Sequence, residues 1–170
     1  MNESAQPEPW LRGTLTEIPA APRAVLHALE LAKEDLRRWC AALSEAQLNT
    51  RPAGIAPVAF HIRHIARSVD RLLTYAEGRN LDAEQLAALK SELAPNANRA
   101  ELFAELEATL AAAARRIVQI DPGRWGEPRS VGKKQLPTTV AGLLVHIADH
   151  TQRHVGQSIT TAKIVTASRV

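Results

Sequence analysis

Three histidines at four-residue intervals are the side chains of this sequence best suited to chemistry. His146, His150 and His154 fall within a run of helical periodicity, and the whole chain has six histidines. Imidazole nitrogen is a good ligand for borderline transition metals. Side chains four residues apart lie one above the other on a helix. The cluster therefore indicates a metal site.

The apolar positions around the cluster separate its members. Leu143 and Ile147 occupy predicted core positions, and His150 and His154 continue the same line in steps of three and four. A polar group buried without a partner costs about 1–3 kcal/mol, and a metal ion would be one partner for both rings. The spacing therefore predicts that His150 and His154 point inward as metal ligands.

Two neighbours on the same predicted helix have less defined roles. His146 lies towards the edge of the inward line, so it could be a ligand, a group behind the ligands or a base lining the site. Gln157 lies almost one turn after His154 and is a candidate to hold a substrate or a bound water.

A second histidine pair lies on another predicted helix. At 100° per residue, His61 is about 70° and His64 about 130° from the centre of the apolar stripe, so amphipathicity favours His61 as the inward group. Both rings also share a polar and aromatic stripe with Ser68, Arg71 and Tyr75. Such a stripe is typical of the wall of a cleft, and either histidine could complete a three-histidine site.

Helical periodicity and breaker residues predict the elements that position these residues. Apolar spacing predicts four long helices, over residues 22–43, 57–76, 97–120 and 138–165, and a short accessory helix over 82–93. The density of proline and glycine over residues 122–137 predicts a loop. With no convincing strand, the sequence predicts an all-α four-helix bundle.

The N-terminal residues differ from the rest of the chain. Residues 1–20 are polar and contain three prolines, which predicts an extended arm before a bundle domain over residues 21–166. Trp10 and Leu11 are apolar enough to dock that arm on the body. His27 stands alone on the first predicted helix and is expected at the surface or its boundary.

Composition excludes several classes of protein. The chain has 170 residues, the size of one domain, and a formal charge of +3 without a basic block, so we expect no nucleic-acid partner. No apolar run approaches the roughly 20 residues of a membrane span, which argues against membrane insertion. A single cysteine and the absence of a secretory signal at the start indicate a cytoplasmic protein.

Other metal architectures lack their motifs. A di-iron carboxylate bundle needs Glu-x-x-His pairs, and neither that motif nor the HExxH zinc-protease motif occurs in the sequence. The stretch from His146 to His150 is similar to the inverted zinc-protease motif, with Asp149 in place of glutamate. Its shorter acid and its setting in a helical bundle argue against a protease.

Two segments together resemble a known family. Residues 60–67, Phe-His-Ile-Arg-His-Ile-Ala-Arg, and residues 149–157, Asp-His-Thr-Gln-Arg-His-Val-Gly-Gln, look like the motifs of the DinB/YfiT-like superfamily. The resemblance covers about residues 20–165. It implies a four-helix bundle with one divalent metal ion on His64, His150 and His154, and it makes His61 a residue behind the ligands or facing the substrate. The common family form has arginine where this chain has Val155.

The resemblance also carries functional expectations. It implies a metal-dependent enzyme, a transferase or hydrolase that acts on a small molecule and could use a low-molecular-weight thiol, with Zn, Ni or Fe as the metal. It further implies a homodimer. His61, His146, Tyr75 and Gln157 could then move protons or orient the substrate, and Arg71 and Ser68 could bind it. The alternative is a non-catalytic bundle that binds or senses metal and acts through a partner.

Overall fold

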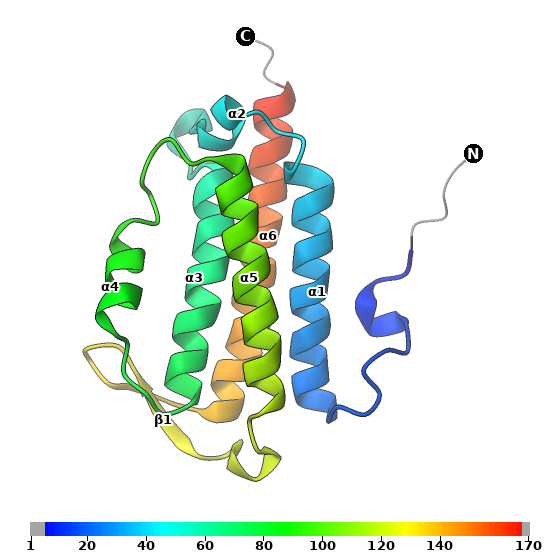
Figure 1. Ribbon diagram of the computed structural model, residues 1–170, viewed down its shortest axis with the longest axis vertical. Helices are drawn as coiled ribbons and strands as arrows, with labels where there is room; N and C mark the ends of the chain where they lie inside the picture. The colour runs from blue at the N-terminus through cyan, green and yellow to red at the C-terminus, as the bar shows by residue number, and fades with distance from the viewer. Residues whose placement is uncertain (1–5, 168–170) are drawn as a thin grey trace.

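Four long helices build the described part of the molecule, and Figure 1 shows their arrangement. The computed structural model describes residues 6–167. In the bundle, α6 packs against both α1 and α3, and α3 also packs against α5. α1 and α6 run in one direction and α3 and α5 in the other. The helices are α1 (Ala20–Cys40), α3 (Val58–Ala76), α5 (Arg99–Val118) and α6 (Val140–Ala167).

Short elements connect the long helices. The connection from α3 to α5 carries α4 back along the outside of the bundle, which allows α3 and α5 to run parallel (Figure 1). No helix among residues 6–167 is long and apolar enough to cross a membrane. The connecting elements are α2 (Glu45–Asn49), α4 (Ala83–Lys90), the strands β1 (Pro128–Val131) and β2 (Leu136–Thr139), and three 3-10 turns at Pro9–Leu11, Pro52–Gly54 and Pro122–Arg124.

Local signals explain where the helices begin and end. The Asp82 side chain accepts a hydrogen bond from the Gln85 backbone at the start of α4, and Gln85 returns one to the Asp82 backbone. At the end of α3, Gly78 adopts φ +80°, where a side chain would be strained. The four-helix bundle and the accessory helix predicted from periodicity are confirmed, with boundaries shifted by a few residues.

The apolar stripes of the long helices meet in one core. Its largest fully buried side chains come from all four long helices and from α2. Burying each such side chain stabilises the fold by about 1.5–3 kcal/mol relative to exposing it. The set includes Leu36, Leu48, Ile62, Ile65, Leu73, Leu106, Ile117 and Ile147.

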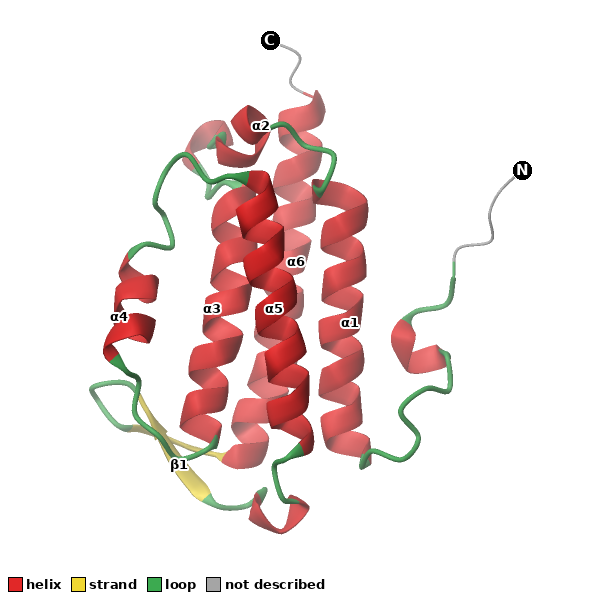
Figure 2. Ribbon diagram, viewed as in Figure 1, coloured by secondary structure: helices red, strands yellow, loops and turns green. Residues whose placement is uncertain are grey.

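The segment expected to be a loop contains a β-hairpin (Figure 2). β1 pairs with β2 antiparallel, with Arg129 opposite Thr138. The Arg129 guanidinium donates to the Ala76 carbonyl at 2.8 Å and also pairs with Glu127. The hairpin is therefore anchored to the end of α3 by tertiary contacts, which a count of turn-forming residues does not reveal.

The N-terminal arm docks through residues other than those expected. Trp10 and Leu11 are 61 % and 57 % exposed and lie in or at the end of a 3-10 turn. The arm is instead held by Arg12, whose guanidinium contacts Glu30 and Glu34 of α1. Two apolar arm side chains also pack against the core, Leu15 and Ile18. The first five residues of the predicted arm lie outside the described range.

The arm also buries the side chain of His27 on α1. This side chain is buried, and its Nε2 lies 3.1 Å from the Thr14 hydroxyl of the arm. The expectation of a surface histidine was wrong because the arm covers this part of α1.

Candidate metal centre

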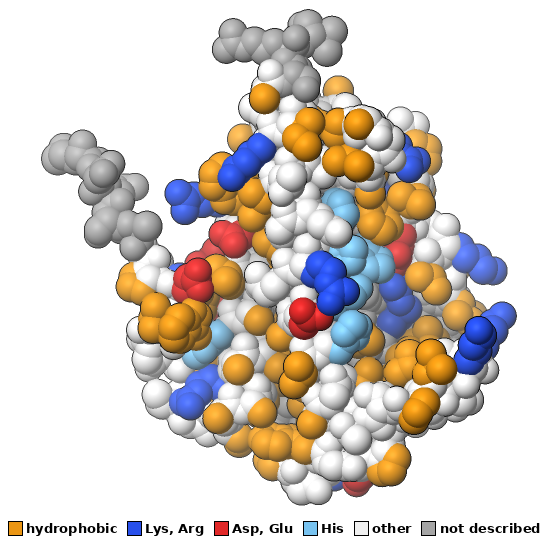
Figure 3. Space-filling model, turned by 180° about the vertical axis from the view of Figure 1, so that it is seen from behind, with side chains coloured by type: hydrophobic (Ala, Val, Ile, Leu, Met, Phe, Trp, Pro, Cys, Tyr) orange, Lys and Arg blue, Asp and Glu red, His pale blue; other side chains and the backbone are white. Residues whose placement is uncertain are grey.

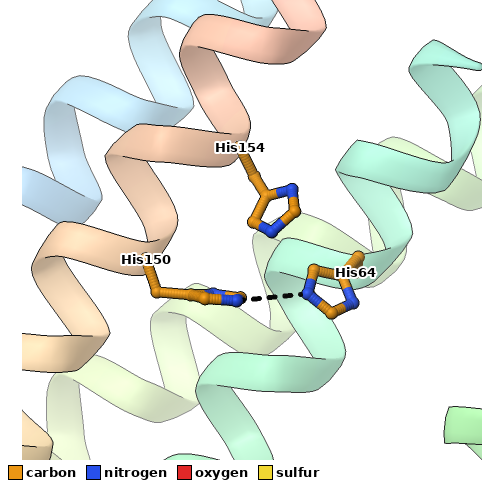
Figure 4. Close-up of side chains that lie close together, drawn as sticks. All are labelled: His64, His150 and His154. Atoms are coloured by element: carbon orange, nitrogen blue, oxygen red, sulfur yellow. Dashed lines mark hydrogen bonds between the residues drawn. The ribbon is translucent and has the colours of Figure 1, made fainter. Parts of the chain in front are cut away.

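Three histidines converge between α3 and α6 (Figure 4). His64 comes from α3, and His150 and His154 come from α6. One nitrogen from each ring can be chosen such that all three lie within 4.8 Å of one another. Histidine side chains gather in the middle of the face opposite to that of Figure 1 (Figure 3). The cluster therefore lies at the surface of the bundle, within reach of small molecules.

The buried line of α6 runs beside the two histidines and does not include them. Thr151 and Val155 are almost completely buried, whereas His150 and His154 are half-buried. Each histidine precedes a buried residue by one position, which rotates it by about 100°. The predicted inward line through His150 and His154 was thus off by one position, and the offset brings both rings to the edge of the core.

Each of the three rings has a polar partner at Nδ1. His64 Nδ1 lies 2.7 Å from Glu92 Oε2, His150 Nδ1 lies 3.4 Å from Ser68 Oγ, and His154 Nδ1 lies 3.1 Å from His61 Nδ1. An ionised carboxylate only accepts, so His64 Nδ1 must carry the proton. The Ser68 hydroxyl donates to the Ile65 carbonyl, which leaves its oxygen to accept from His150.

The two Nε2 atoms on the inner side of His64 and His150 face one another. They lie 3.3 Å apart. With protons on both Nδ1 atoms, both Nε2 atoms present lone pairs, which repel one another unless a proton or a metal ion lies between them. Two nitrogens bound to one tetrahedral metal ion at 2.0–2.1 Å would lie about 3.4 Å apart. The spacing and the donor atoms therefore fit a metal ion held by imidazole nitrogens.

The surroundings keep His61, His150 and His154 neutral. Burial, reinforced by the neighbouring histidines, lowers the pKa of His61 and of His150 to about 4. The pKa of His154 is lowered to about 4 by burial, then by His64 and Arg153. Because only the neutral ring has a free lone pair, these rings are ready to bind metal at neutral pH.

Comparison with known families matches this chain over both histidine-bearing segments. The family model of the DinB superfamily matches residues 28–158, well over half of the chain. This chain belongs to the DinB superfamily. The resemblance seen in the sequence is thereby confirmed, and the match runs from within α1 to within α6, leaving the arm outside.

The fold of this chain is similar to a solved structure. YfiT from Bacillus subtilis superposes with a TM-score of 0.63 and 16 % identity, over 86 % of this chain and 87 % of that one. YfiT is described as a probable metal-dependent hydrolase with an unusual four-helix bundle topology. At this identity the likeness establishes the fold. A search of curated proteins found no match.

His61 lies beside the three-histidine cluster. It is 5 % exposed, more buried than the half-buried His64, as amphipathicity predicted. Its Nδ1 contacts His154, whereas the three-ring cluster is completed by His64. The two sequence arguments thus point to different rings for different reasons. Periodicity identifies His61, the more buried ring, and the family motif identifies His64, the ring that faces His150.

The other predicted site residues separate into near and distant groups. Ser68 lies behind His150, and the ring of exposed His146 has its centroid 5.2 Å from that of His150. Gln157 is exposed on the same helix, after His154. Tyr75 lies about three turns, or 16 Å, further along α3 than His64, so the structure does not bring it to the cluster.

Arg71 has a structural partner that the sequence did not suggest. It is buried, and its Nη1 donates to Glu92 Oε1 at 2.7 Å. Arg63 and Arg67 likewise donate to backbone carbonyls of residues 88–94. These three arginines therefore hold the segment after α4 against α3, a role that their spacing in the sequence does not reveal.

Glu92 is the site residue that sequence reasoning missed. It is 5 % exposed and contacts both His64 and Arg71. Burial alone would raise the pKa of this carboxyl, but the hydrogen bonds from His64 and Arg71 outweigh it and lower the pKa. Glu92 is therefore a buried carboxylate directly behind one ring of the cluster.

Proposed function

We propose that this member of the DinB superfamily is a metal-dependent enzyme in which His64, His150 and His154 hold one divalent transition-metal ion, Zn, Ni or Fe. The observation that carries the proposal is the pair of Nε2 atoms 3.3 Å apart on His64 and His150, each on a ring whose Nδ1 has its own partner. A pair of lone pairs at this distance is unfavourable unless a proton or a metal ion lies between them.

The arrangement of residues suits catalysis at the surface of the bundle. When bound, such an ion would lower the pKa of a coordinated water or thiol and polarise a substrate carbonyl. Three protein ligands leave a coordination position open, as catalytic sites do. His146 lies at the exposed rim beside His150, where its imidazole can accept a proton from an incoming water or thiol. Gln157 is exposed on the same helix and can hydrogen-bond a substrate.

This arrangement suits two classes of reaction on a small-molecule substrate. Hydrolysis comes first, because the fold neighbour YfiT is described as a probable metal-dependent hydrolase. Group transfer with a low-molecular-weight thiol is the second, supported by the family resemblance. Ser68 and Arg71 take roles behind the ligands in this proposal, since both are engaged by His150 or Glu92.

Metal content of matched variants tests the proposal. We expect about one equivalent of Zn, Ni or Fe per chain in the reconstituted wild-type protein, and its loss in His150→Ala. His146→Ala is the control, because it removes an exposed ring of the same helix and should keep the metal. The reaction class is then tested with ester, amide and electrophilic substrates, each with and without added thiol. Wild-type protein that takes up no metal would overturn the proposal.

One observation favours a non-catalytic alternative. His61 Nδ1 lies 3.1 Å from His154 Nδ1, so His61 could swing to become a fourth ligand and close the site. A closed site is typical of structural metal binding, and such a bundle would act as a metal sensor through a partner. The number of imidazoles around the bound metal distinguishes the two.

A homodimer stays a prediction of the family resemblance, which sedimentation of the purified protein would test.

A further inference from the structure

A buried chain of charged groups runs from the cluster to the segment after α4. Glu92 accepts from His64 Nδ1 through Oε2 at 2.7 Å and from Arg71 Nη1 through Oε1 at 2.7 Å. The side chains of Arg71 and Glu92 are 11 % and 6 % exposed. Water therefore has little access to this chain, and each hydrogen bond in it is stronger than it would be at the surface.

Glu92 is fixed in place from several directions. Arg63 Nη1 donates to the backbone carbonyls of Glu92 and Ala94, both at 3.0 Å. One turn further along α3, Arg67 donates to the Ala88 carbonyl and the Ser91 hydroxyl. The backbone that carries Glu92 is thus held to the same helix as His64, so the carboxylate has little freedom to leave the ring.

The ring of His64 is also held from its flat side. Phe60, one turn earlier on α3, stacks on it with centroids 5.2 Å apart and an angle of 19° between the planes. Stacking alone would allow the ring to flip over. The hydrogen bond to Glu92 prevents this, because it requires Nδ1 to face the carboxylate. The orientation of the ring therefore depends on the carboxylate.

From these contacts, we infer that Glu92 is a positioning residue that holds the proton of His64 on Nδ1 and so directs the Nε2 lone pair towards His150. The benefit of this positioning rests on the proposed metal centre. The tautomer of His64 itself does not, because it exists without metal. Carboxylates behind metal-binding histidines orient the ring and make it a stronger ligand, and their loss typically weakens metal affinity about 10–100-fold.

Glu92→Gln is the sharpest perturbation of this arrangement. Glutamine keeps the shape but offers one carbonyl oxygen, while Arg71 and His64 both need an acceptor. The permanently charged guanidinium should take that oxygen. The glutamine amide would then donate to His64 Nδ1 and move the ring proton to Nε2, where it points at His150.

The matched control is Glu105→Gln. Glu105 of α5 pairs with Arg67, which lies on α3 like Arg71, but Glu105 does not contact a histidine. A loss seen in Glu92→Gln and absent from Glu105→Gln would separate the effect on His64 from the general loss of an ion pair on α3. Arg71→Met is a second variant, because it removes the other partner of Glu92 and leaves the contact between Glu92 and His64.

Nitrogen chemical shifts of the His64 ring measure the tautomer directly in metal-free protein at pH 7.5. The inference predicts the Nδ1-protonated form in the wild type, in Glu105→Gln and in Arg71→Met, and the Nε2-protonated form in Glu92→Gln. The same tautomer in wild type and Glu92→Gln would overturn it. A change in Arg71→Met without one in Glu92→Gln would also overturn it.

Zinc titration against a competing chelator gives the second readout. We expect zinc affinity about 10–100-fold weaker in Glu92→Gln and unchanged in Glu105→Gln. Equal zinc affinity in wild type and Glu92→Gln would overturn the inference while leaving the proposed function intact. Wild-type protein that binds no zinc, nickel or iron would overturn the proposed function, and the tautomer measurement would still decide the role of Glu92.

Discussion

The metal-free protein should lose stability as the pH falls from 7 to 5. His61, His150 and His154 have pKa values lowered from 6.5 to about 4, first by burial and then by neighbouring charges. In the unfolded chain the same rings take up protons below pH 6.5, whereas the folded protein resists doing so until about pH 4. The unfolded state therefore binds more protons between pH 4 and 6.5, and stability is lost as the pH falls through that window.

The size of the loss follows from the same values. One independent ring with these two pKa values contributes about 2 kcal/mol less stability at pH 5 than at neutral pH. The three rings titrate as a coupled group and two are partly exposed, so we expect about half of the simple sum, roughly 3 kcal/mol. Typical domains have about 5–15 kcal/mol of stability in total, so this loss is readily measured.

Urea unfolding followed by circular dichroism is the assay, with a metal chelator present at pH 5, 6 and 7. His154→Gln should reduce the pH dependence because it removes one of the three rings whose pKa is lowered. His146→Gln is the comparison, since that ring is exposed and its charge contributes to lowering the pKa of His150; it should reduce the pH dependence by less than His154→Gln does. An unfolding free energy that stays level between pH 7 and 5 would refute the reasoning that burial holds these rings neutral.

Three further predictions concern the fold. Ile147→Ala leaves a cavity where α6 meets the core and should cost about 2–5 kcal/mol of stability. Val145→Ala, at a side chain 66 % exposed, should change stability by less than about 0.5 kcal/mol. Equal losses of the two variants in urea unfolding would contradict the assigned burial. Gly78→Ala should cost about 1–2 kcal/mol because of its positive φ, whereas Gly156→Ala, with open space around its Cβ within α6, should raise the melting temperature. Arg12→Ala should release the arm from α1, so chymotrypsin should cut near residues 10–15 faster without a change in unfolding of the bundle; unaltered cleavage would show that the arm is held by other contacts.

Periodicity was enough to predict the bundle. The apolar stripes of the four long helices are long and regular, so their existence and order follow from spacing alone. The hairpin after α5 was missed because each strand has four residues, and its pairing is supported by Arg129 reaching the end of α3. Contacts of that kind depend on the tertiary structure and leave no local pattern.

The cluster was predictable in part for a similar reason. His150 and His154 share a helix, so their spacing reports that they lie together. His64 lies on α3, and nothing in its own spacing says that it faces them, which is why amphipathicity favoured the more buried His61. Glu92 follows α4, far from every histidine in the sequence, and only the fold brings its carboxylate to His64.

Metal coordination in the reconstituted wild-type protein decides whether His64, His150 and His154 form a metal centre with an open position. X-ray absorption at the metal edge counts the imidazole ligands and reports their distances. We expect one metal ion per chain with three imidazole nitrogens at about 2.0–2.1 Å if the ion is zinc, and at least one further ligand that exchanges with added thiol. A metal-free protein, or an ion enclosed by four imidazoles with no exchangeable ligand, would contradict it.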